Sequence, residues 1–251
     1  MNALKLAAFA CIVPFALSAQ SPAPQAPSAS AKPLRHLEYA FQADYTTNGE
    51  GHGSGMDAGG EGGVSSGVHS MLGGGGRRGT MAVDVLGLAP DGALVVVVNE
   101  MLQEAPRPGE RFTCTIYGDG HVLCPTADGP LTDAENLLLS LLGRGFIDAT
   151  VSDSNKHWRR TYDGKQVSVV TDYTIANVGD GGRVTIVKHS TITSRTRSIG
   201  DSVEDGKIVY DTTLSVPDTV ADTVYETYHD RSLQSTFDLT LKSDTFAQPA
   251  H

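Results

Sequence analysis

Two cysteines, Cys114 and Cys124, flank a Gly-Asp-Gly turn in the stretch FTCTIYGDGHVLCP. A three-residue loop at 118–120 would place them directly opposite one another on paired antiparallel strands, about 4.5–5.5 Å apart at Cα, which suits a disulfide. A two-residue loop would shift the register and send the sulfurs to opposite faces. Glycine at the third loop position favours the first register. We predict a structural disulfide rather than a redox pair or half of a zinc site, because neither CxxC spacing nor ligand-spaced partners are found.

The most unusual polar cluster, residues 153–160 (DSNKHWRR), surrounds the single tryptophan. On a strand, His157 and Arg159 would share one face, while Trp158 and Arg160 would share the other. An arginine fork beside an aromatic plane can bind an anion or a sugar, so these four residues are the ligand-binding candidates. The competing interpretation is an edge strand whose tryptophan is anchored in the core.

The sequence shows no residue spacing typical of a catalytic or metal-binding motif. The eight histidines show neither HxH nor HExxH spacing. The string GVSSG at 63–67 lies in a glycine-rich segment rather than between a strand and a helix, where a hydrolase nucleophile would sit. Glu204 and Asp205 fall in EDGK, which is typical of a turn. We expect no catalytic residue, metal or cofactor; a hydrolase whose site assembles from distant strands is the alternative.

The N-terminus predicts export. Residues 1–19 place Lys5 ahead of an apolar run and end on Ser18-Ala19, which is typical of a secretory signal peptide cleaved after Ala19. Cys11 would leave with it; its position in mid-run disfavours the alternative role of a lipid attachment site. The mature chain then keeps an even pair of cysteines in an oxidising compartment, periplasmic or extracellular. No later run is long and apolar enough to span a bilayer, so we expect no transmembrane segment after cleavage.

Two segments are poor in residues that could be buried. Residues 20–33 are Pro, Ala and Ser, and predict a disordered linker. Residues 49–79 hold 14 of the 28 glycines, and we predict a flexible insertion because so few apolar side chains cannot offset the chain entropy. Two functional alternatives are an anion site in GGGGRRG and a metal site formed by His52, Asp57, Glu61 and His69.

The rest of the chain predicts a single mainly β domain at 34–247. Residues 36–46 alternate apolar and polar side chains, and ten similar runs follow, separated by short breakers such as APDG, GDG, VGDGG and EDGK. Connections this short require antiparallel neighbours, so about ten strands should form a meander. One amphipathic helix is expected at about 132–143, with Thr132 and Glu135 at capping-box spacing and a leucine stripe. A single helix cannot cover so wide a sheet, which must curl into a partial barrel or fold into a sandwich.

This layout is similar to that of the half-barrel lipoprotein carriers of bacterial periplasms, although no motif of that family is present. The likeness implies that the sheet would hold its ligand on the concave side, where Tyr39, Phe41, Leu94, Val96 and Val98 are equally good core positions. The net charge of −10 and pI of about 5.1 disfavour nucleic acid and anionic lipid headgroups. We expect an exported non-catalytic envelope protein that binds a lipid or other apolar small molecule, or an envelope protein partner; a structural assembly module with pairing strands is a further alternative.

Overall fold

The computed structural model describes residues 31–48, 76–104, 111–127, 129, 131–147, 150–152, 154–164, 166–195, 200–228 and 231–247. They form one 11-stranded antiparallel sheet, a short 3-10 turn and one helix. The elements are β1 (Arg35–Asn48), β2 (Gly76–Leu88), β3 (Leu94–Leu102), β4 (Arg111–Ile116), β5 (Val122–Leu123), α1 (Asp133–Leu141), β6 (His157–Asp163), β7 (Val167–Val178), η1 (Asp180–Gly182), β8 (Arg183–Ser194), β9 (Asp201–Asp211), β10 (Val216–Tyr228) and β11 (Arg231–Phe246).

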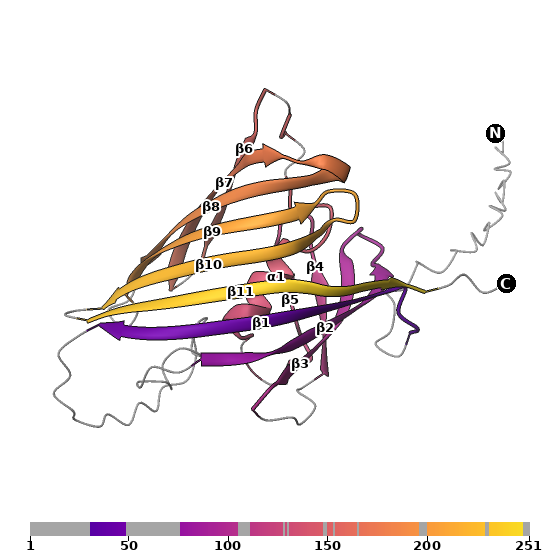
Figure 1. Cartoon of the computed structure of the whole chain (residues 1–251), viewed down its shortest axis with the longest axis horizontal. Helices are drawn as coiled ribbons and strands as arrows, with labels where there is room; N and C mark the ends of the chain where they lie inside the picture. Colours follow the sequence, from indigo (N-terminus) through magenta and orange to yellow (C-terminus); the bar gives the residue numbers. More distant parts are fainter. Residues whose placement is uncertain are drawn as a thin grey trace, which may run out of the picture.

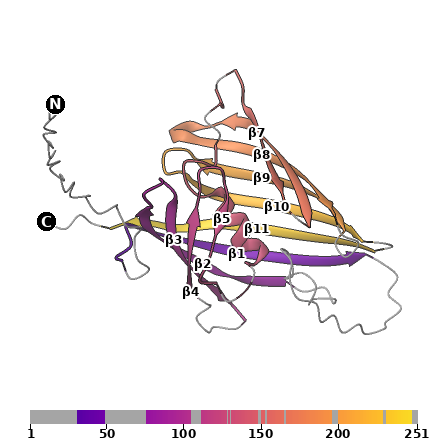
Figure 2. The same ribbon diagram turned by 180° about the vertical axis from the view of Figure 1, so that it is seen from behind.

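The strands follow the order β5-β4-β3-β2-β1-β11-β10-β9-β8-β7-β6, so two meanders meet where β1 pairs with β11. The sheet is strongly curved and does not close, and α1 lies on its concave side (Figures 1 and 2). The predicted meander is confirmed, and the choice between partial barrel and sandwich is resolved: there is one open, curled sheet. Short turns explain the antiparallel order because a parallel crossover needs a dozen or more residues.

Helix α1 begins at the predicted capping box. The Thr132 hydroxyl accepts a hydrogen bond from the Glu135 N–H (3.2 Å), and the Glu135 carboxylate accepts one from the Thr132 N–H (2.7 Å). Its leucines join one continuous core with side chains from both meanders; the fully buried ones are Leu138, Leu139 and Leu141. Burying each leucine contributes about 2 kcal/mol, which holds the helix against the sheet.

The cysteine hairpin has the predicted register. Thr115 pairs with Leu123 and Ile116 with Val122, and a three-residue loop ends at Gly120, whose φ is +86°. That left-handed backbone conformation favours glycine. The register places Cys114 opposite Cys124, and the two form a disulfide.

Two expectations about glycine-rich stretches need correction. Residues 76–79, the end of the predicted flexible insertion, belong to β2, where Gly79 lies so close to Phe41 and the Met101 carbonyl that a Cβ would clash. The motif EDGK at 204–207 is not a turn but the middle of β9, and the turn comes later, at 212–215. The sequence pattern treats glycine as a strand breaker, whereas at these places it allows close packing.

Several expectations lie outside the described residues. These include the signal peptide at 1–19, nearly all of the linker at 20–33, and residues 49–75 of the insertion with the proposed ligands His52, Asp57, Glu61 and His69.

Candidate functional site: the concave face of the sheet

An aromatic cluster joins β6 to the loop that follows α1. Trp158 is 3% exposed and stacks on Tyr173 with ring centroids 5.0 Å apart and planes at 12°. Phe146, from the loop, meets Trp158 and Tyr173 edge-on and also contacts Tyr210. The indole is thus buried and packed against other aromatic rings, as the core interpretation of this tryptophan predicted.

Arg160 lies on the same side of β6 as Trp158, and its side chain contacts residues from the loop after α1 and from the opposite edge of the sheet. Its guanidinium donates to the backbone carbonyls of Gly145 and Phe146, the latter at 3.0 Å. It also lies against Gly120, where an added Cβ would meet it at 2.1 Å. Gly120 belongs to the β4–β5 turn at the opposite edge of the sheet, so Arg160 connects the two edges through the loop after α1.

His157 and Arg159 lie on the outer face, as the alternation predicted. Arg159 forms a two-pronged ion pair with Asp172 (2.8 and 2.9 Å), and His157 Nε2 lies 3.1 Å from the same carboxylate. The pKa of Asp172 is lowered, chiefly by the hydrogen bond from Arg159. The four candidate residues therefore do not converge on one point, and their role in ligand binding stays a prediction.

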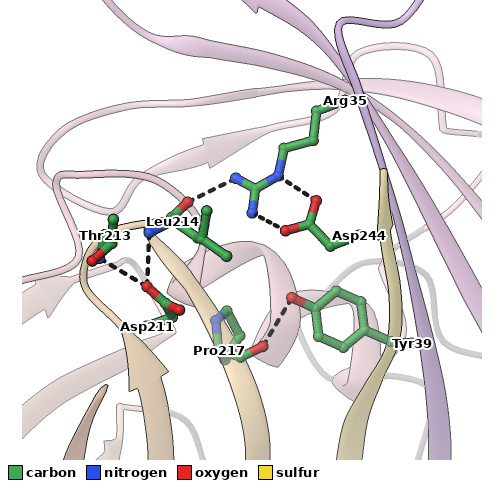
Figure 3. Close-up of polar contacts among 7 residues, drawn as sticks. All are labelled: Arg35, Tyr39, Asp211, Thr213, Leu214, Pro217 and Asp244. Atoms are coloured by element: carbon green, nitrogen blue, oxygen red, sulfur yellow. Dashed lines mark hydrogen bonds and ion pairs between the residues drawn. The ribbon is translucent and has the colours of Figure 1, made fainter. Parts of the chain in front are cut away.

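A polar network lies near the C-terminus of α1. Figure 3 shows Arg35 bound to both oxygens of Asp244 (2.8 and 2.7 Å) and to the carbonyl of Leu214 (2.7 Å). Beside it, Asp211 accepts two backbone N–H bonds within the β9–β10 turn, and the Tyr39 hydroxyl donates to the Pro217 carbonyl at 3.0 Å.

The same turn anchors the helix. The Gly143 N–H donates to the Ser215 carbonyl (3.1 Å), and the Gly143 carbonyl accepts from the Tyr210 hydroxyl (2.9 Å). These contacts fix the C-terminal end of α1, while Tyr39, Phe41, Val96 and Val98, all expected on the concave side, are buried core residues.

A buried charge cluster lies on the concave face of β8, β9 and β10. The Lys188 amine donates to Asp222 at 2.7 Å and to Glu204, and the side chain of Asp222 is fully buried. Gly206 pairs with both Lys188 and Asp222, and a Cβ there would come within 2.9 Å of the Asp222 carboxylate. The glycine of EDGK therefore provides the space that this cluster occupies.

One lysine is shared by two carboxylates in this cluster. Burial is the largest influence on Asp222 and, despite the opposing charge of Lys188, raises its pKa to about 7, with the charge of Glu204 adding to the rise. Burial is also the largest single influence on Glu204 and acts to raise its pKa, but attraction to Lys188 and hydrogen bonds with Asp222, Lys188 and Ser190 together lower the pKa. Burial acts to lower the pKa of Lys188, yet the two acids raise it, so the amine remains protonated.

This arrangement suits an internal ion pair better than a catalytic base. A protonated lysine cannot accept a proton from the neighbouring Ser190, which is fully buried and bonded to Thr171 (3.1 Å). Sequence reasoning missed the cluster because EDGK resembled a turn. One signal was available: in RVTIVKHS, Lys188 occupies an inward position of the alternation, after Val184 and Ile186.

Strands β7 to β11 and β1 continue past α1 to the far end of the sheet (Figures 1 and 2). Five half-buried concave residues cross this end side by side, and we call them the distal row: Val169, Ile192, Ser202, Glu226 and Leu233. Its three apolar members are not part of the main core cluster. The concave face thus carries apolar side chains beyond the part that the helix covers.

An open depression of about 530 Å³ lies on the far side of β1 and β2 from the core and is lined by Asp44, Gly76, Arg78, Gln103 and Glu104. Within the described ranges, no group of three or more His, Cys, Asp or Glu side chains could hold a metal ion, and no helix has the length and apolar character needed to cross a membrane.

The fold is that of an open, curved antiparallel sheet around one short helix, and comparisons add little to it. No family model and no curated protein matches the chain. A solved structure described as "Lipid-protein interactions in lipovitellin" matches at 8% identity with a TM-score of 0.39, over 88% of this chain and 26% of that chain. The lipid named there belongs to lipovitellin, and a likeness this distant does not transfer it to this chain.

Proposed function

We propose that this chain is an exported, non-catalytic binding protein that holds a lipid or similar amphiphile on the concave face of its sheet. The observation that carries the proposal is the distal row, where Val169, Ile192 and Leu233 are only half-buried beyond the helix. Apolar side chains on an inward-curving surface favour an apolar ligand, since covering them removes about 25 cal/mol per Å² from contact with water.

Polar side chains border the distal row on the side of the helix. Next to the distal row lie the hydroxyls of Thr171 and Ser190 and the carboxylate of Glu204. Thr171 and Ser190 are buried and bonded to one another, so the acyl chain of an amphiphile would lie on the apolar residues of the distal row and not on these hydroxyls. The signal sequence supports the exported location, where a disulfide such as Cys114–Cys124 persists.

The proposal is tested by native mass spectrometry of the mature protein, purified from its own host without detergent and then titrated with a long-chain fatty acid. We expect a bound adduct, and we expect Ile192→Lys, which places a charge in the distal row, to weaken fatty-acid binding by roughly tenfold or more. Thr193→Lys is the matched control, because Thr193 is the next residue on β8 and points to the opposite, exposed face. Unchanged binding in Ile192→Lys, or a chain that takes up no fatty acid, would reject the proposal.

A further inference from the structure

The two edges of the sheet differ in how they are covered. At the β4–β5 edge, the disulfide holds residues 122–127 against β4, and the Thr113 N–H donates to the Thr126 hydroxyl at 2.7 Å. At the other edge, β6 has β7 as its only neighbour among the described strands. An uncovered edge strand offers its backbone groups to another strand.

The backbone groups that β6 presents follow from its register with β7. The Ile175 N–H donates to the Lys156 carbonyl (2.8 Å) at one end, and the Gly164 N–H donates to the Val167 carbonyl (2.9 Å) at the other. Bonded and non-bonded pairs alternate in an antiparallel ladder, so the N–H and C=O groups of 159, 161 and 163 point away from β7. Three consecutive outward positions can bond a further strand.

We propose that the occupant of this edge is a second copy of the same chain, whose β6 pairs antiparallel with the first about a two-fold axis at Thr161. This register sets Arg159 opposite the second copy's Asp163, and Arg160 opposite the second copy's Tyr162, each pair occurring twice. The opposite charges of Arg159 and Asp163 and the central threonine pair favour association, while Arg160 stays bound to the carbonyls of Gly145 and Phe146 in its own chain. The Asp163 side chain is 71% exposed and pairs with Arg195, and the proposed contact would extend this ion pair to Arg159 of the second copy.

Other registers of pairing between the two copies of β6 are less complementary. A two-fold axis at Arg160 would set two guanidinium groups opposite one another, and like charges in that position are destabilising. An isologous pairing is also the commonest route to a homodimer, because one self-complementary patch suffices. The resulting dimer joins two sheets at β6 and leaves the distal row free, so the inference does not depend on the proposed ligand.

The experiment measures the mass of the mature chain by analytical ultracentrifugation, from about 1 to about 100 µM. We expect a monomer–dimer equilibrium that Thr161→Pro abolishes. Proline removes only the outward N–H of residue 161 and is tolerated in edge strands, so the circular dichroism spectrum should not change. Thr161→Val, which keeps the N–H, should still dimerise. A wild-type monomer at every concentration, or a dimer that persists in Thr161→Pro, would overturn the proposal.

A cross-link provides a readout that does not depend on proline being tolerated. In the proposed register the two copies of residue 161 lie about 5.5 Å apart at Cα, within the range of a disulfide. Thr161→Cys should therefore form a covalent dimer on oxidation, whereas Thr174→Cys, exposed on neighbouring β7, should not. Equal cross-linking of both variants, or no cross-linking of Thr161→Cys, would contradict pairing at β6.

Discussion

Neighbouring arginines on β6 have different environments, and this difference predicts their effect on stability. Arg160 is partly buried and bonds two backbone carbonyls, whereas Arg159 is exposed and paired only with Asp172. Arg160→Ala should lower the free energy of unfolding by about 1–3 kcal/mol, because the carbonyls of Gly145 and Phe146 lose their donor. Arg159→Ala should have a clearly smaller effect, since exposed pairs contribute little.

Urea unfolding followed by Trp158 fluorescence measures both variants, because the indole lies between Arg159 and Arg160 in sequence and is buried in the aromatic cluster. Equal losses of unfolding free energy in the two variants would show that the hydrogen bonds from Arg160 to Gly145 and Phe146 stabilise the fold no more than the exposed Arg159 ion pair does.

Glu135, the capping residue of α1, predicts a pH dependence. Burial raises its pKa to about 7 from an ordinary 4.5, and the backbone bond from Thr132 opposes this only in part. The folded chain therefore binds more protons than the unfolded chain between these values, so this residue makes stability fall as the pH rises from about 4.5 to about 7.

Thermal unfolding across this pH range tests the assignment. Glu135→Gln keeps the capping box but cannot ionise, so its melting temperature should fall less than that of the wild type as the pH rises. Asp133 and Asp222 will leave a residual slope, because the pKa of each is also raised, mainly by burial, to about 6 and about 7. Identical pH profiles of the melting temperature in the wild type and in Glu135→Gln would show that Glu135 does not cause the pH dependence.

At the scale of the element, the disulfide hairpin shows what a local pattern can predict. The loop length, the register and the cysteine pairing all follow from the spacing of Cys114, Gly120 and Cys124, since only nearest neighbours in the chain are involved. The helix, read from its capping box and leucine stripe, is equally local. By contrast, Gly206 resembled a turn residue because its reason for being small lies on two other strands, at Lys188 and Asp222.

The candidate site was harder to predict for the same physical reason. Alternation assigned the faces of residues 157–160 correctly, but it could not show that the loop at 145–146 satisfies Arg160 or that Asp172 neutralises Arg159. Those partners are distant in the chain and are brought near by the curvature of the sheet. The buried ion pair likewise depends on contacts among three strands that no spacing rule connects.

Removing the disulfide should loosen one edge of the sheet without unfolding the domain. Cys114→Ala/Cys124→Ala opens a loop of about ten residues. The chain-entropy relation predicts that this lowers the free energy of unfolding by about 2–3 kcal/mol. We expect faster hydrogen exchange in β4 and β5, and little change in β8 and β9. The intact bond also predicts a mass about 2 Da below that of the reduced chain under non-reducing conditions. A wild-type protein with two alkylatable thiols would contradict the structure at this hairpin.

At the scale of the whole molecule, the core joins two meanders whose described strands pair with one another only at β1 and β11. Helix α1 and Phe146 fill the space between them, and the core cluster runs without interruption from β4 to β6. The helix therefore acts as the shared interior of both meanders, and their stabilities should be coupled through it.

Leu138→Ala tests this coupling. Leu138 is fully buried on α1, and its truncation should cost about 2–5 kcal/mol through lost burial and the cavity left behind. If the meanders are coupled, hydrogen exchange should accelerate in both β3 and β8. Leu86→Ala is the matched control, because Leu86 is equally buried but belongs to a small separate cluster with Val95 and Val97. Its effect should stay within β2 and β3, whereas a Leu138→Ala effect confined to one meander would show that the two halves of the sheet are stabilised independently.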